Sequence, residues 1–170
     1  MDDPISRIEW RLAATLKANL YNPNVVHGPE MKLLERSILL TGWVQPVLVT
    51  TDGTIIDGFH RCMLARQSPA LLEAYSGRVP CAVIDVDLPR AMILTIRMNR
   101  AKGTHVALRM SEIVHKLVNE HDLAPEEVAV EIGATMAEVT LLLQDGIFKA
   151  KNIAQHVYSK AWYPIETTRR

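Results

Sequence analysis

Residues 54–56, a β-branched segment, lead directly into Asp57-Gly58-Phe59-His60-Arg61 and then into an amphipathic stretch ending near Arg66. This order predicts a short strand, a turn at Asp-Gly and a helix that begins at once. The first turn of a helix leaves backbone N–H groups without intrahelical partners, and the helix dipole favours negative charge there. With an imidazole and a guanidinium at the same corner, the chain has a candidate phosphate-binding site.

Strand and helix patterns alternate through the first part of the chain. The apolar spacing predicts strands over 8–12, 44–51, 54–56 and 79–86, and helices over 29–41, 59–66 and 88–98. A loop rich in small residues is expected before Val79. This alternation predicts an α/β or α+β fold over residues 1–105.

The second part, residues 106–170, is expected to be all helical. Helices are predicted over 106–119, 123–132 and 136–144, with a tight turn at Gly133. Helix, glycine turn and helix form the pattern of a helix-turn-helix. Residues 111–150 carry two basic and eight acidic residues, a net charge of −6, which weighs against DNA binding by this segment.

Composition sets broad limits on the class of protein. The 170 residues are 48% hydrophobic, enough to bury a substantial core, and the formal net charge is zero. Two cysteines are too few for a disulfide framework and lack the spacing of a zinc site. The first residues do not resemble a signal peptide, and no membrane-spanning apolar run occurs, so a cytoplasmic protein is expected.

Several motifs occur in the order found in one known superfamily. They are Asn22-Pro23, Ser37-Ile38, the segment 42–49 (Gly-Trp-Val-Gln-Pro-Val-Leu-Val), Asp57 to Arg61, and Met98-Asn99-Arg100. Together they resemble the ParB N-terminal/sulfiredoxin superfamily, in which a helix-turn-helix follows the first domain in ParB proteins. The resemblance implies a ParB/sulfiredoxin-like mixed sheet with helices, followed by an all-α helix-turn-helix domain.

The resemblance also implies a nucleotide site, because the segment 57–61 stands where ParB proteins bind the phosphates of CTP. Its sequence is closer to the corresponding segments of sulfiredoxins and of ParB-fold serine kinases, which bind adenine nucleotides. Phe59 replaces the catalytic cysteine of sulfiredoxins, so sulfinic acid reduction is not expected. The residues expected to bind a nucleoside triphosphate, ATP or CTP, are Gln45, Pro46, Gly58, His60, Arg61, Asn99 and Arg100.

Some of these residues have structural alternatives. Gly58, His60 and Arg61 either cradle the phosphates or form an ordinary corner with solvated side chains and Asp57 as helix N-cap. Asp57 is also a candidate Mg²⁺ ligand beside phosphates. Glu30 either serves as a catalytic base, as in the kinase relatives, or complements the helix dipole. Asn99 and Arg100, with Lys102, Thr104 and His105, are expected in a polar loop.

Three functions remain open at this level. The first is a nucleoside-triphosphate-binding, DNA-associated switch of the partition or regulatory type, with a homodimer as a candidate assembly. The second is an enzyme, an NTPase or an ATP-dependent phosphotransferase acting on a hydroxyl group, with Glu30 and Asp57 as catalytic residues. The third is a transcriptional co-regulator without nucleotide dependence. If DNA is bound, the candidate contacts are Thr140, Gln144, Lys149 and Lys151.

Overall fold

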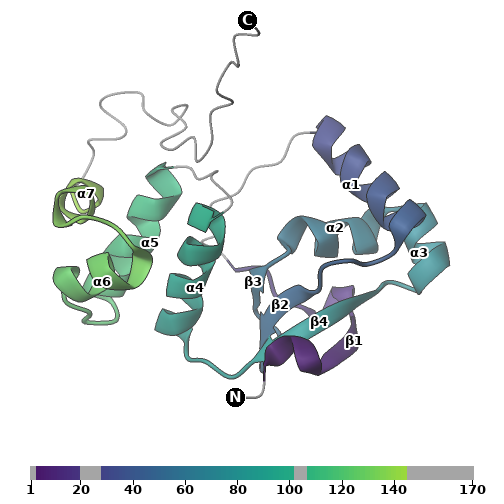
Figure 1. Cartoon of the computed structure of the whole chain (residues 1–170), viewed down its shortest axis with the longest axis horizontal. Helices are drawn as coiled ribbons and strands as arrows, with labels where there is room; N and C mark the ends of the chain where they lie inside the picture. Colours follow the sequence, from purple (N-terminus) through teal and green to yellow (C-terminus); the bar gives the residue numbers. More distant parts are fainter. Residues whose placement is uncertain (1–2, 20–27, 102–106, 145–170) are drawn as a thin grey trace, which may run out of the picture. The chain divides into compact units, whose positions relative to one another are not determined.

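The computed structural model describes residues 3–19, 28–101 and 107–144 (Figure 1). The chain divides into two compact units, Met1–Thr95 and Ile96–Arg170, so the division falls inside a helix. The sequence predicts the domain boundary after residue 105, among residues outside the described part, and that boundary stays a prediction. Each unit is described by itself below.

The first unit is built on a four-stranded mixed sheet. Its strands are β1 (Ile8–Leu12), β2 (Val47–Thr50), β3 (Ile55–Asp57) and β4 (Arg78–Ile84), in the order β1-β4-β2-β3. The β1–β4 and β2–β3 pairs are antiparallel, and the β2–β4 pair is parallel. With the helices that accompany it, this mixed sheet confirms the predicted α+β fold.

Helices α1 (Gly28–Thr41), α2 (Phe59–Gln67) and α3 (Pro69–Tyr75) accompany this sheet in the first unit (Figure 1). Short 3₁₀ turns, η1 (Pro4–Ser6) and η2 (Ala13–Thr15), flank β1. The core joins apolar residues of β2 and β4 to Cys62 and Ala65 on the buried side of α2. Burial of this helix face fixes α2 against the sheet and thereby positions the corner where α2 begins.

Helix α3 corrects the loop that the sequence predicts before Val79. The Ser68 side chain accepts a hydrogen bond from the Leu71 N–H at 3.2 Å and so caps the helix, and Pro69 occupies its first turn. Leu71 is fully buried against Ile38 and Leu64. This tertiary burial stabilises a helix of only seven residues, which is too short to produce a clear periodic signal.

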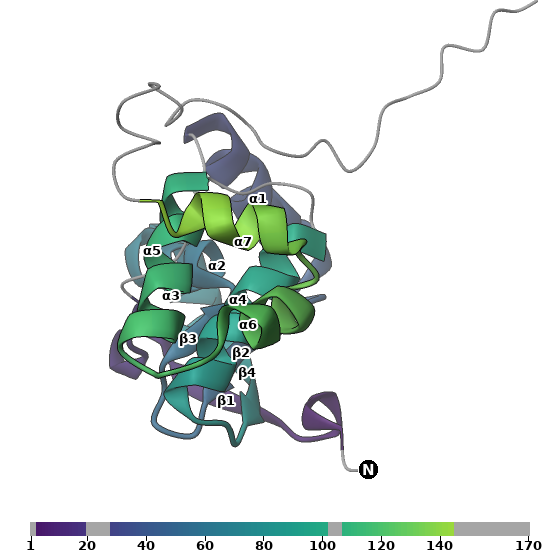
Figure 2. The same cartoon turned by 90° about the vertical axis from the view of Figure 1, so that its left-hand side faces the viewer.

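Helix α4 (Leu88–Ala101) contributes to both units, and α5 (Ala107–Asn119), α6 (Pro125–Ile132) and α7 (Met136–Leu142) follow it (Figure 2). Buried residues of the last three helices, among them Ile113, Leu117, Val128 and Val139, form their core. Gly133, with φ of +66°, ends α6, and the Thr135 side chain caps α7. The use of α6 and α7 as a DNA-reading helix-turn-helix stays a prediction.

None of the helices in the described ranges is both long and apolar enough to cross a bilayer.

Candidate phosphate-binding site

The predicted corner lies where β3 passes into α2. Strand β3 ends at Asp57, Gly58 adopts the left-handed conformation with φ of +94° and ψ of +21°, and α2 begins at Phe59. Gly58, not Asp57, occupies the N-cap position, which corrects the alternative that made Asp57 the cap. Because glycine has no side chain, Gly58 supplies no oxygen to the first N–H groups of α2.

Arg61 points into the protein and ties this corner to the segment before β2. Its Nη1 donates to the carbonyl oxygens of Gln45 at 2.7 Å and Pro46 at 2.8 Å, and its Nη2 donates to Asp57 Oδ2 at 3.0 Å. Arg61 is only 8% exposed. Burial lowers the pKa of Arg61, and the neighbouring Asp57 carboxylate opposes that shift, so the guanidinium keeps its charge.

The structure therefore brings together Gln45, Pro46, Asp57, Gly58 and Arg61, which the sequence predicts as one site. The inward orientation of Arg61 differs from the solvated arginine of the alternative reading. Its signal in the sequence is the i, i+4 spacing of Asp57 and Arg61, which predicts an ion pair. The two carbonyl partners have no sequence signal, because they depend on the path of the chain before β2.

His60 lies in the first turn of α2 and is partly buried. Its ring meets the ring of Phe59 edge to face, with a centroid separation of 5.6 Å. Phe59 itself packs against the core of the sheet. The imidazole is thus held beside the start of α2.

Asp57 does not by itself make a metal site. Its carboxylate is partly buried and paired with Arg61 at 3.0 Å. Within residues 3–19, 28–101 and 107–144, no group of three His, Cys, Asp or Glu side chains is arranged to hold a metal ion. The residues around Asp57 do not fit a magnesium site made of protein ligands alone. A role of Asp57 in binding Mg²⁺ together with phosphates stays a prediction.

Asn99 and Arg100 lie in α4, which corrects the expectation that they belong to a loop. Asn99 is 3% exposed. Arg100 Nη1 pairs with Glu138 Oε1 at 2.7 Å, and its Nη2 donates to the Gly133 carbonyl at 3.2 Å. Within the second unit, Arg100 therefore joins α4 to the turn between α6 and α7. Lys102, Thr104 and His105 lie outside the described residues.

The remaining predicted residues occupy separate places. Glu30 is exposed in the first turn of α1, and its catalytic role stays a prediction. Thr140 on α7 and Gln144 just beyond it are exposed. Asn22, Pro23, Lys149 and Lys151 lie outside the described residues.

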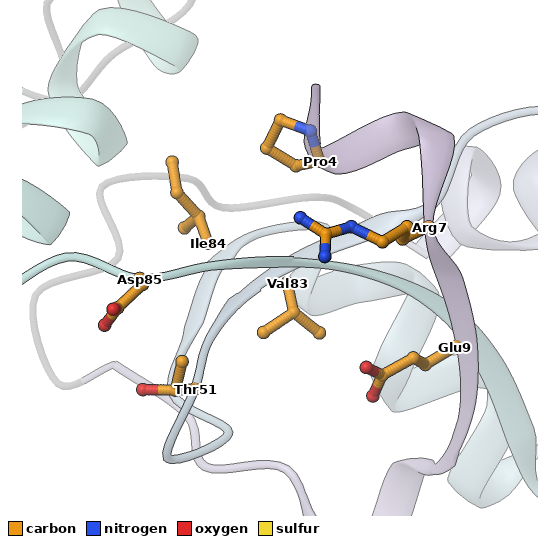
Figure 3. A pocket seen from close by; sticks show the side chains of 7 residues that line it. All are labelled: Pro4, Arg7, Glu9, Thr51, Val83, Ile84 and Asp85. Atoms are coloured by element: carbon orange, nitrogen blue, oxygen red, sulfur yellow. The ribbon is translucent and has the colours of Figure 1, made fainter. Parts of the chain in front are cut away.

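A surface pocket of about 380 Å³ lies elsewhere in the first unit (Figure 3). Arg7 and Glu9 border it on one side and Thr51 and Asp85 on the other, with Val83 between them. Its lining includes none of the residues predicted to bind phosphate. The pocket is thus distinct from the corner at Gly58.

Both cysteines are buried and free. Burial raises the pKa of Cys62 to about 11 and also raises the pKa of Cys81. Both thiols are therefore protonated at neutral pH, and a protonated, buried thiol is a poor nucleophile.

The fold and this corner together define a ParB-like N-terminal domain, and comparison with known proteins supports that class. The chain is 36% identical over 166 residues to the uncharacterized protein YbdM of Escherichia coli K12, a match covering 95% of this chain and 78% of YbdM. It is 29% identical over 136 residues to a probable chromosome-partitioning protein ParB of Vibrio cholerae, covering 77% of this chain and 44% of that protein. No protein-family model matches.

Solved ParB structures share the fold. A Pnob8-like ParB N-domain superposes with a TM-score of 0.60 at 12% identity, over 88% of this chain and 74% of that one. C-terminally truncated ParB from Caulobacter crescentus, complexed to the centromeric parS site, superposes with a TM-score of 0.51 at 20% identity, over 85% of this chain and 78% of that one. The chain is thus a relative of YbdM and has the fold of ParB N-terminal domains. It spans less than half the length of the Vibrio protein.

Proposed function

We propose that this protein binds a nucleoside triphosphate at the corner between β3 and α2 and that the nucleotide controls its association with DNA. The observation that carries the proposal is the geometry of the corner, an α2 N-terminus next to a left-handed Gly58 with the charged Arg61 directly beneath it. Helix N-termini with glycine on the approach are suited to phosphate groups.

Each residue has a defined part in this proposal. Gly58 makes the left-handed turn at which α2 begins, and the phosphates are expected to meet the first N–H groups of the helix there. His60 supplies a further donor from the same turn. Arg61 lies beneath the N-terminus of α2, where its hydrogen bonds hold the carbonyls of residues 45 and 46 and the Asp57 carboxylate. Its positive charge adds to the electrostatic attraction of the corner for phosphate.

DNA enters the proposal from the second unit. The Caulobacter ParB with this fold was solved on its centromeric parS site. The exposed Thr140 and Gln144 are candidates for base contacts, and Lys149 and Lys151 for phosphate contacts. Since residues 111–150 are acidic, DNA affinity should depend on these few lysines and fall steeply with salt.

Isothermal titration calorimetry with CTP, ATP, GTP and inorganic tripolyphosphate, each with and without magnesium chloride, tests the nucleotide step. We expect one nucleotide to bind best, and His60→Ala to weaken it by about tenfold because a donor to a charged ligand is lost. His121→Ala, in the turn after α5, is the matched control and should bind like the wild type. Absence of heat and of any thermal shift with all four ligands would contradict the proposal.

The switch has its own test, based on reciprocity. If nucleotide changes DNA affinity by some factor, DNA must change nucleotide affinity by the same factor. Fluorescence anisotropy with a labelled duplex, with and without the best nucleotide, measures the first factor, and calorimetry on the DNA complex measures the second. If a nucleotide binds but leaves the DNA affinity unchanged, this result contradicts the proposed switch and agrees with the proposed nucleotide site.

A further inference from the structure

Strand β1 is a terminal strand of the sheet, and its outer side has the properties of a pairing surface. In the order β1-β4-β2-β3, β1 pairs with β4 alone among the described strands. Its five residues contain no proline and no lysine, which commonly protect an edge strand from pairing, and its two charged residues are Glu9 and Arg11. An edge of this kind is available to a further strand.

The hydrogen bonds between β1 and β4 show which backbone groups of β1 face outward. The Ala13 N–H donates to the Gly77 carbonyl at 2.8 Å, continuing the register in which Arg11 faces Val79. In an antiparallel pair the inward groups alternate, so Ile8, Trp10 and Leu12 direct their N–H and C=O groups to the outer side. The Trp10 carbonyl accepts only a long hydrogen bond, 3.3 Å, from the exposed side chain of Arg78.

The side chains of β1 form two different faces. Ile8, Trp10 and Leu12 lie on one face and are 37%, 47% and 44% exposed. Glu9 and Arg11 lie on the other face and form an ion pair with a separation of 2.8 Å. The strand is thus apolar on one face and carries opposite charges, placed evenly about Trp10, on the other.

We propose that two copies of this protein associate through antiparallel pairing of their β1 strands, centred on Trp10. Outward-facing residues must pair with outward-facing residues, which leaves three registers with substantial overlap. Centring on residue 9 places two glutamates opposite each other, and centring on residue 11 places two arginines opposite each other. Centring on Trp10 places Glu9 of each copy opposite Arg11 of the other and pairs all five residues.

Charge complementarity therefore selects one partner and one register. A twofold axis at Trp10 pairs Ile8 with Leu12 of the second copy and places the two Trp10 side chains on the same apolar face, where each ring also stacks on Tyr75 of its own chain at a centroid separation of 6.1 Å. The Arg78 side chain has to leave the Trp10 carbonyl, which then accepts from the Trp10 N–H of the second copy. The Leu12 carbonyl, which accepts from the Thr15 hydroxyl at 2.8 Å, has to accept from the Ile8 N–H of the second copy as well. The two four-stranded sheets become one continuous sheet, independently of any nucleotide.

Charge reversal provides the decisive test, with self-association measured by sedimentation velocity over a concentration series. Glu9→Arg or Arg11→Glu alone places like charges opposite each other twice and should weaken the dimer by about tenfold or more. The double variant Glu9→Arg/Arg11→Glu restores opposite charges in the same register and should restore the dimer. Glu120→Arg, an equal charge change at an exposed site on the second unit, should leave it unchanged.

Cysteine crosslinking checks the register. Residues 10 of the two copies face each other at a Cα separation of about 5.5 Å, which permits a disulfide. Trp10→Cys should therefore crosslink on mild oxidation. Leu12→Cys should not, since the two residues 12 are about 14 Å apart in this register. The buried Cys62 and Cys81 do not interfere.

A monomeric wild type at high micromolar concentration would overturn the proposal. It would also be overturned if both single reversals dimerised like the wild type, or if the double variant stayed as weak as the singles. Circular dichroism verifies that each variant is folded, and nucleotide titration of the monomeric variants shows whether the α2 site works without the dimer. If the protein binds no nucleotide, the inferred β1 dimer is unaffected. If the protein does not dimerise, the proposed nucleotide site is unaffected.

Discussion

Arg61 occupies the space beside Gly58 that a side chain at position 58 would need. A Cβ built on Gly58 would lie 3.0 Å from Arg61 Nη2 and 3.2 Å from Cζ. Gly58 also has φ of +94°, a conformation that other residues rarely adopt. The glycine thus serves two purposes, since it makes the turn into α2 and leaves room for a buried guanidinium.

Replacing Gly58 with alanine should destabilise the protein by about 2 kcal/mol, because the left-handed strain adds to the close contact with Arg61. Gly53→Ala is the matched control. Gly53 has a similar φ of +86°, but its nearest neighbour would be 3.7 Å from the new Cβ. Urea unfolding should give the larger loss for Gly58→Ala. Equal losses would show that the Arg61 contact contributes nothing.

Removing Arg61 should cost more than removing an exposed arginine. Arg61→Ala removes the hydrogen bonds from Arg61 to the Asp57 carboxylate and to the Gln45 and Pro46 carbonyls, a loss expected to be about 3 kcal/mol. Arg36→Ala, on the exposed side of α1, should change the free energy of unfolding by less than about 0.5 kcal/mol. Similar small losses in both variants would contradict the structural role of Arg61.

The Arg100–Glu138 pair should stabilise the position of α7 in the second unit. The two side chains are partly exposed and 2.7 Å apart, so their coupling should be about 0.5–1 kcal/mol. A double-mutant cycle with Arg100→Ala and Glu138→Ala measures this coupling by chemical denaturation. A coupling energy of zero would mean that Arg100 acts only through the Gly133 carbonyl.

We expect the folded protein to lose stability at high pH because of the Cys62 thiol. Burial raises its pKa to about 11, whereas an unfolded thiol titrates near about 8.5. The folded state therefore holds this proton more tightly, so its contribution is complete below about pH 8.5 and is lost as pH rises toward 11. Urea unfolding at pH 7, 9 and 10.5 should show a smaller decline for Cys62→Ala than for the wild type. An identical decline would contradict the prediction.

Much of the fold can be predicted from the sequence because the main elements have strong local signals. The alternation of residues 8–12 gives β1 with the bounds found, and the apolar spacing up to Gly42 gives α1. Helix α3 is missed because seven residues cannot show periodicity and burial of Leu71 supports it. The loop predicted at Asn99 and Arg100 is wrong because polar residues there continue α4 and pair within the second unit.

The structure brings some of the predicted site residues together, and their role in binding a nucleotide stays a prediction. The order of motifs brings Gln45, Pro46, Asp57, Gly58 and Arg61 into one set, and the structure places them in contact. The direction of Arg61 depends on carbonyl groups at 45 and 46, contributed by a different part of the chain. Sequence periodicity contains no information about such contacts, so a charged residue is expected to face solvent by default.

Backbone amide NMR of the isotopically labelled protein, during titration with the nucleoside triphosphate that calorimetry selects, tests phosphate binding at the α2 corner directly. We expect the amides of Phe59 and His60, in the first turn of α2, to show large saturable shifts, while those of Arg66 and Gln67 in its last turn change little. A saturating nucleotide that leaves the Phe59 and His60 amides unmoved would contradict phosphate binding at this corner.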